Sequence, residues 1–266
     1  MAARAMWKGQ LKIGTTKVPV KLYSAVQDRT VRFNILDDRH KMRVKQHMID
    51  PDSGDEVPTE EIQKGYEIEP GRFVVLTAED LEALQPPPSR DIEIAEFVDQ
   101  DKISQQWFER PYYLGPDDGA DSGGVKDYFA LAEALNKQEK EGIAHWVMRN
   151  KYYAGVLRSI DDYLYLFTLR DAKEVISAND LAKPTGAAPT QKELAMATQL
   201  VEMLRGDFNA ADYKDEYRER VEKFIEQKAR GRAPRLQAVK TKRRTDALGS
   251  ALEKSIAALK KGKRAA

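Results

Sequence analysis

The chain lacks cysteine and is poor in histidine, with three among its 266 residues. Without cysteine, disulfide bonds and thiolate metal sites are excluded, and with them most secreted disulfide scaffolds and zinc fingers. His40, His47 and His145 do not form an HExxH pattern, and the GxSxG motif of serine hydrolases is absent. No spacing among the 43 acidic residues singles out an acid–base pair. The sequence gives no positive reason to expect an enzyme, a metal or a cofactor.

Long apolar runs are also missing. Stretches such as Ile143–Met148 fall far short of the roughly 20 apolar residues that cross a membrane. Residues 1–8 lack the apolar core of a signal peptide. We therefore expect a protein of the reducing cytoplasm with no membrane partner. The length and the 41% of apolar residues allow one large domain and a smaller one.

The chain has a strong charge asymmetry, which its net charge of +1 conceals. Residues 228–266 hold 13 of the 44 Lys and Arg but only two of the 43 Asp and Glu, so this segment carries +11 and the remainder −10. A basic segment attracts polyanions because each neutralised phosphate releases counterions. A solubilising terminus is the alternative. The density of Lys and Arg in 232–266 favours disorder in the free protein.

Residues 7–180 have the pattern of a mainly β domain. Short β-rich runs are separated by turn residues, which is typical of a barrel or sandwich. Asp161-Asp162 predicts a hairpin turn, and Thr77 can cap a short helix that ends before Pro86. A second helix has an apolar face formed by Val125, Tyr128, Ala132 and Leu135. The predicted strands are Val18–Tyr23, Phe73–Leu76, Asp91–Val98, Gly142–Met148, Tyr152–Leu157 and Tyr163–Leu169.

The pattern changes after residue 180. Residues 181–190 are rich in Pro, Gly and Ala and predict a linker. In 191–231 the apolar period becomes 3.6, which predicts two helices. Thr190 and Glu193 form a capping box for the first helix, which Gly206 ends. The second helix, which ends at Gly231, carries on one face Tyr213, Tyr217, Val221, Phe224 and Ile225.

The second of these helices is not expected to enter a DNA groove. Its exposed face mixes many acids with its bases, and the acids would be repelled by phosphates. We interpret its aromatic face as a surface for a protein partner. The alternative is that Tyr213, Tyr217 and Phe224 only pack against the first helix.

Two apparent ligand motifs are better explained as turns. Residues 9–16 have the glycine spacing of a phosphate loop, but Thr15 stands where the phosphate-binding lysine belongs. Residues 50–55 resemble a calcium loop, but Asp55 occupies the place of the required glycine. We therefore interpret 50–55 as the tip of a hairpin.

A more specific pattern lies in residues 39–48. In a strand, alternate side chains share a face, so one face would be basic and the other would carry Met42, Val44 and Met48. A return strand over about Val57–Tyr66 would complete a two-stranded ribbon that contacts phosphates. The alternative is an ordinary charged edge hairpin. The residues predicted to contact DNA are Arg39, Lys41, Arg43, Lys45, His47 and Lys64.

Several segments resemble the bacterial Ku proteins of non-homologous end joining. No single segment is diagnostic, and the resemblance rests on their order and number over about residues 7–231. The segments are Trp7–Gly14, Val18–Ala25, Phe33–Leu36, Glu56–Pro58, Lys64–Glu67, Pro111–Leu114, Tyr213–Arg218 and Ile225–Gly231.

The resemblance implies a Ku-type β-barrel core over residues 7–180 with a DNA-encircling arm at about 37–66. Two copies would form a ring that binds double-stranded DNA ends without sequence specificity and prefers linear to closed circular DNA. The 191–231 region would recruit and stimulate the multifunctional ATP-dependent DNA ligase of end joining. The protein would be nucleoid-associated in the cytoplasm. The residues expected to contact the ligase are Tyr213, Tyr217, Arg218, Val221 and Phe224.

Two other functions stay open. An architectural, chromatin-like protein would coat DNA through the basic tail and bind without regard to ends. A nuclease acting on ends would need carboxylates around a divalent metal.

Overall fold

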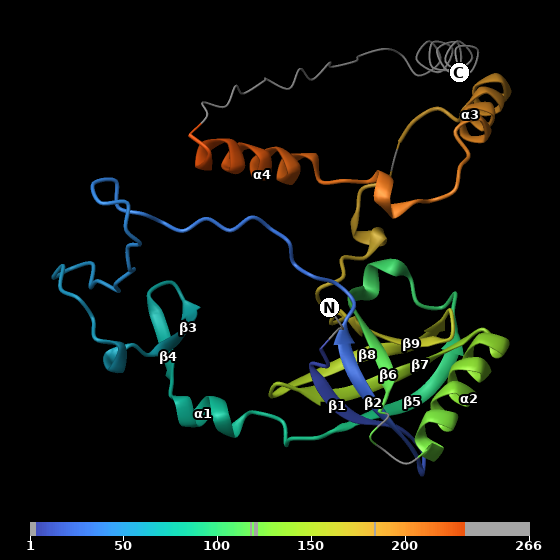
Figure 1. Cartoon of the computed structure of the whole chain (residues 1–266), viewed down its shortest axis with the longest axis horizontal. Coiled ribbons are helices and arrows are strands. Elements are labelled where there is room, and N and C mark those ends of the chain that lie inside the picture. Colours follow the sequence, from blue (N-terminus) through green and yellow to red (C-terminus); the bar gives the residue numbers. More distant parts are fainter. Residues whose placement is uncertain (1–3, 118, 120–121, 184, 232–266) are drawn as a thin grey trace. The chain divides into compact units, whose positions relative to one another are not determined.

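The computed structural model describes residues 4–117, 119, 122–183 and 185–231, and the predicted basic tail, 232–266, lies outside them. Seven strands form a closed barrel in the order β1-β2-β6-β9-β8-β7-β5 (Figure 1). Neighbours run antiparallel except β1 and β5, whose parallel pairing closes the barrel. The strands are β1 (Trp7–Ile13), β2 (Thr16–Ser24), β5 (Asp91–Asp99), β6 (Phe108–Pro116), β7 (Lys140–Met148), β8 (Lys151–Ile160) and β9 (Tyr163–Leu169). The expectation of a mainly β barrel fold is confirmed.

Alternating side chains fill the interior of the barrel. In β2, Val18, Val20 and Leu22 are buried, whereas the residues between them face outward. β1 contributes Leu11, which lies opposite Ile92 at the closure of the barrel and is also fully buried. This burial of apolar surface is the main source of stability of the domain.

The helix α2 (Ser122–Gln138) packs on the barrel through the predicted apolar face, where Tyr128, Ala132 and Leu135 are buried. The Tyr128 hydroxyl donates to the carbonyl oxygen of Leu114 at 2.5 Å and accepts from the N–H of Leu164 at 2.9 Å. Leu114 and Leu164 are cross-strand partners in β6 and β9. One buried hydroxyl therefore ties α2 to two strands.

Tight turns join the antiparallel strands. Gly14, with φ +58°, lies in the turn between β1 and β2. Asp161 and Asp162 have φ of 49° and 64° and form the predicted hairpin turn between β8 and β9. Arg149 and Asn150, with φ of 50° and 61°, form a matching turn between β7 and β8. Positive φ at both central residues matches the twist of a hairpin.

A long excursion, residues 25–90, separates β2 from β5. It contains a 3₁₀ turn at Thr59–Glu61, a two-stranded sheet of β3 (Lys64–Glu69) and β4 (Arg72–Leu76), and the short helix α1 (Ala78–Ala83). Thr77 caps α1 as predicted, in a reciprocal capping box with Asp80. None of residues 23–91 is buried. The excursion therefore has no core of its own.

The predicted basic strand over residues 39–48 is wrong. Residues 38–40 form a turn, Lys41 has a left-handed backbone with φ 55°, and Arg43 makes only an isolated bridge with Leu36. The predicted return strand is also wrong, because Lys64 pairs with Leu76 of β4 rather than with the 39–48 segment. The two-stranded sheet of the excursion is thus β3 with β4.

The chain divides into two compact units. The barrel and the excursion from Asn34 onwards belong to the first, and the second comprises Thr30–Phe33 and the chain from Leu181. Short 3₁₀ turns at Gln105–Trp107 and Ala178–Asp180 lie in the first unit. Among the described residues, no helix has the length and apolar character needed to cross a lipid bilayer.

The second unit contains the two predicted helices, α3 (Gln191–Met203) and α4 (Glu216–Ala229), and a 3₁₀ turn at Ala210–Asp212. The capping box of Thr190 and Glu193 is confirmed. α4 begins later than predicted, because the Asp215 carboxylate accepts the Arg218 N–H as an N-cap. Tyr213 therefore lies before the helix and not on its face. In the described residues α3 and α4 do not pack along each other, so the alternative in which Tyr213, Tyr217 and Phe224 only pack against the first helix is not observed.

Candidate nucleic-acid interface

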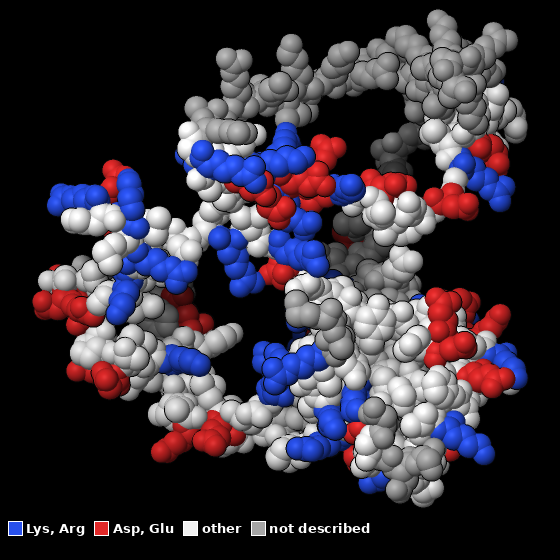
Figure 2. Space-filling view, viewed as in Figure 1, with Lys and Arg blue, Asp and Glu red and all other residues white. Residues whose placement is uncertain are grey.

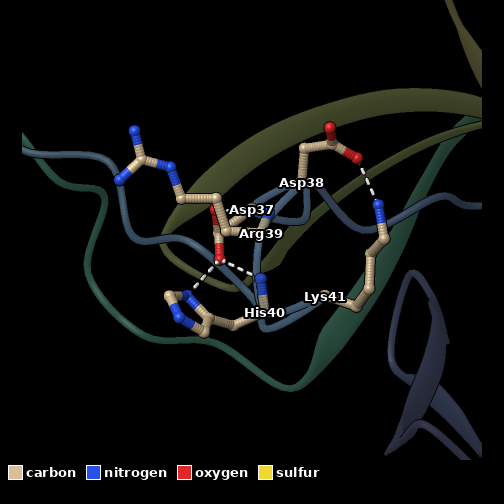
Figure 3. Close-up of polar contacts among 5 residues, drawn as sticks. All are labelled: Asp37, Asp38, Arg39, His40 and Lys41. Atoms are coloured by element: carbon tan, nitrogen blue, oxygen red, sulfur yellow. Dashed lines mark hydrogen bonds and ion pairs between the residues drawn. The ribbon is translucent and has the colours of Figure 1, made fainter.

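Two residues of the predicted DNA-contact set, Arg39 and Lys41, lie in or next to one turn of the excursion (Figure 3). The Asp37 carboxylate accepts the backbone N–H groups of Arg39 at 3.0 Å and His40 at 2.7 Å, and contacts His40 Nδ1 at 2.9 Å. These hydrogen bonds hold the pKa of Asp37 below its ordinary value, and the bond from the Arg39 N–H has the largest effect. Asp37 therefore acts as the structural centre of the turn.

Lys41 and Arg39 leave this turn in different ways. The Lys41 ammonium pairs with the Asp38 carboxylate, whereas the Arg39 guanidinium points away from both Asp37 and Asp38 (Figure 3). The two side chains do not share a strand face. Arg39 is consequently the more available of the two for an external anion.

The remaining predicted bases are spread along the excursion. His47 pairs through Nδ1 with the Glu56 carboxylate, so its ring is held by a local partner. Within the described residues, the side chains of Arg43, Lys45 and Lys64 form no hydrogen bond or ion pair, and all three are exposed. The structure therefore does not gather the predicted set on one surface, but it leaves several of its cations without a local partner.

The segment between the two halves of this region forms the predicted hairpin tip. Ile49 bridges to Glu56, and the Asp50 N–H donates to the Asp55 carbonyl oxygen at 2.9 Å. The Asp50 carboxylate accepts the N–H groups of Ser53 and Asp52, and these bonds lower the pKa of Asp50. In the part of the chain that the structure describes, no group of three or more acidic or histidine side chains is arranged to hold a metal ion.

The excursion also exposes an unusual amount of apolar surface. β4 contributes Phe73, Val74 and Val75, and β3 contributes Tyr66 and Ile68, all more than 40% exposed. In total fifteen large apolar side chains are exposed in residues 25–90. Isolated two-stranded sheets are marginally stable in water, and exposed apolar patches of this kind mark interaction surfaces. The sequence pattern did not show this feature, because each residue type is ordinary for a strand.

The predicted ligase-contact residues lie in the second unit. Tyr217 is exposed on α4, and Tyr213 is exposed before it, stacked on Phe208 with ring centroids 5.4 Å apart. Val221 and Phe224 are partly exposed, and Lys228 Nζ lies 5.4 Å from the centre of the Phe224 ring. Arg218 forms an ion pair with Glu222 at 3.6 Å. The structure thus leaves the aromatic side chains of this region largely uncovered.

The closed barrel, the long excursion between β2 and β5 and the separate helical unit define the class of the protein. The family model of the Ku70/Ku80 beta-barrel domain matches residues 12–196. This match begins near the end of β1 and ends within α3, so it spans the excursion and all the barrel strands from β2 onwards.

Similar proteins extend the match over most of the chain. The Non-homologous end joining protein Ku of Anaeromyxobacter sp. (strain K) is 41% identical over 232 residues, which is 87% of this chain and 77% of that protein. The Non-homologous end joining protein Ku 2 of Geotalea uraniireducens is 35% identical over 258 residues, covering 96% and 98%. The Ku protein of Pseudomonas aeruginosa is 36% identical over 230 residues, covering 85% and 77%. The chain belongs to the Ku family.

Proposed function

We propose that two copies of this chain form a ring that binds the ends of double-stranded DNA and brings the end-joining ligase to them. The family supports a role in non-homologous end joining, since the relatives carry that name. A ring holds DNA through its phosphates and needs neither base-specific side chains nor a catalytic site. We therefore assign the protein a binding function rather than an enzymatic one.

The excursion carries the case for a dimer. Ordering a residue costs about 1–2 kcal/mol in backbone entropy, and this cost is normally offset by burial of apolar surface. None of residues 23–91 is buried, and fifteen large apolar side chains of the excursion are exposed. A polyanionic duplex cannot cover them, so a protein surface must. Since most oligomers are symmetric homodimers, we assign that surface to a second copy.

Basic side chains of the same excursion supply the DNA contacts in this proposal. Arg39, Arg43, Lys45 and Lys64 have no side-chain ion pair among the described residues and project from turns or strands. Contacts of this kind neutralise phosphates, so binding weakens linearly with the logarithm of salt concentration. Lys41 and His47 contribute less, because their side chains already pair with Asp38 and Glu56.

The experiment that tests the DNA contacts compares two double variants. Arg43→Gln with Lys45→Gln removes two unpaired charges of the excursion, and Arg110→Gln with Lys126→Gln removes two exposed charges from β6 and α2. Each variant removes two charges from both copies of the ring, so we expect the first to lower the slope of log affinity against log salt by about 4, and the second to leave it unchanged. Equal slopes for the two variants would show that the excursion does not contact the phosphates.

The helical unit is proposed to dock the ligase. Leu194, Val201, Phe208, Tyr213 and Tyr217 are exposed, and no packing between α3 and α4 covers them. Aromatic residues are enriched in protein interfaces, and Tyr is enriched among the few residues that carry most of the binding energy. The mixed charges of α4 suit a protein surface better than DNA.

A further inference from the structure

The barrel contains a hollow that the residues predicted from the sequence do not touch. It lies where β1 begins, where the excursion rejoins β5 and where β7 turns into β8, and its volume is about 560 Å³. Trp7, Arg90 and Arg149 come from these three places. All of its lining residues belong to the unit that holds the barrel.

Backbone and side-chain contacts fix the walls of the hollow. The Trp7 ring lies over Gly9, where a Cβ would be only 1.9 Å from it, so only glycine permits this position. The Gln10 N–H donates to the Arg90 carbonyl oxygen at 2.8 Å and anchors the return of the excursion. On the opposite wall, the Asn150 amide donates to Gln85 Oε1 at 2.6 Å. The hollow is therefore a built feature of the barrel.

The hollow combines an apolar floor with a basic rim. Val147 and Met148 are buried, whereas Arg90 and Arg149 are exposed. Among the described residues, neither arginine side chain has a hydrogen-bond or ion-pair partner. The two-residue turn with positive φ fixes the point from which Arg149 projects.

No carboxylate belongs to the described residues that line the hollow. Lys8 of the lining pairs with the Asp117 carboxylate at 3.4 Å, and the same carboxylate lies 3.0 Å from Lys21 Nζ. The positive charge of the rim therefore comes from Arg90 and Arg149. Figure 2 shows Lys and Arg side chains gathered at this end of the barrel.

We propose that this hollow binds one phosphate of a DNA strand together with its adjoining sugar. Two arginines present the planar donor groups that match phosphate oxygens, and the hollow lies in the volume range of small-ligand sites, larger than a lone phosphate requires. The Trp7 ring and the apolar floor suit the face of a sugar. The inference rests on the proposed DNA-binding function and adds a barrel contact that lies outside residues 37–66.

Salt dependence tests the site on the full chain. The double variant Arg90→Gln, Arg149→Asn removes both charges, and asparagine tolerates the left-handed backbone at 149. Both copies of the ring lose both charges, so with a short linear duplex we expect the slope of log affinity against log salt to fall by about 4 relative to the unsubstituted protein. The matched control is Arg110→Gln with Lys126→Gln, which should keep the original slope. A slope equal to that of the control would overturn the proposal.

Two further readouts separate the possible failures. Suppose that the unsubstituted protein prefers linear to closed circular DNA and that the Arg90, Arg149 variant keeps the slope of the control. The proposed phosphate site is then refuted, whereas the proposed binding of DNA ends is supported. If the unsubstituted protein shows no preference for ends but the variant lowers the slope, the proposed ring is refuted, whereas the proposed phosphate site is supported. Deoxyadenosine monophosphate is the third arm. The unsubstituted protein could bind this nucleotide while the Arg90, Arg149 variant does not, and the two proteins could still have the same salt slope with DNA. That result would identify a small-nucleotide site and refute the DNA assignment.

Discussion

The apolar surface of β4 makes a quantitative prediction about dimerisation. Phe73 and Val75 alternate along β4 and so share a face, and they are 59% and 52% exposed in the single chain. Gly65 lies opposite Val75 and adds no side chain to cover this face. We predict that Phe73→Ser with Val75→Ser weakens self-association strongly.

The size of the effect follows from the exposed area. Complete burial of a Phe or Val side chain contributes about 1.5–3 kcal/mol, and about half of this remains to be gained for each of these two residues. Each substitution occurs twice in a two-fold dimer, so the association free energy should weaken by about 3–6 kcal/mol. The dissociation constant of the dimer should therefore rise by about 10²-fold to 10⁴-fold.

Sedimentation equilibrium over a wide concentration range measures this constant. Phe129→Ser with Ile176→Ser is the control, because these exposed residues lie on α2 and beyond β9, outside the excursion. The barrel should stay folded in both variants, since no core residue belongs to the excursion. The reasoning would be refuted if the β4 variant had the same dissociation constant as the unsubstituted protein. It would also be refuted if the unsubstituted protein were monomeric at all concentrations.

Three further predictions concern the core, the helical unit and the basic tail. Tyr128→Phe should lower the free energy of unfolding by about 2–4 kcal/mol in urea, because Leu114 and Leu164 each lose a buried partner, while the exposed-site control Tyr152→Phe should not. Burial raises the pKa of Tyr128 in the folded protein, so above pH 10 the tyrosine ionises first in the unfolded chain. The stability of the unsubstituted protein should therefore fall above pH 10, and Tyr128→Phe should lack that part of the pH dependence. Tyr217→Ala with Phe224→Ala should abolish stimulation of the ligase in a ligation assay but spare DNA binding; full stimulation would exclude this docking surface. Removal of residues 232–266 should leave binding to linear DNA in gel-shift assays, and complete loss of binding would make the tail the binding element.

Apolar alternation made most of the barrel predictable. β2, β5, β7, β8 and β9 were found because their buried faces are continuous. β1 and β6 were missed as strands. β1 includes Lys8, Gly9 and Gln10, and β6 carries Pro111 where its register with β9 shifts. Proline and glycine at such irregular positions remove the pattern on which sequence reasoning depends.

The basic segment shows why alternation alone is insufficient. Residues 39–48 alternate in charge, but the opposite face has nothing to bury against, and Met42 and Met48 remain exposed. The side chain of Asp37 instead binds the backbone of the next residues and starts a turn. The pairing of Lys41 with Asp38 depends on that turn, so the sequence did not reveal which cations are neutralised.

Residues of the hollow were missed for a different reason. Arg90 and Arg149 are far apart in sequence, and only closure of the barrel brings them to the same hollow as Trp7. Arg149-Asn150 between two strand patterns was the available signal, because it places a cation in a tight turn. Tyr213 was misplaced because Asp215 caps α4 and excludes the tyrosine from the helix.

The most direct test of the ring compares one DNA as a linear fragment and as a covalently closed circle in gel-shift assays at moderate salt. A ring that threads onto ends should bind the linear form, and an excess of the circle should not displace it. Equal binding to both forms, or ready displacement by the circle, would contradict the ring and indicate coating of DNA through basic side chains.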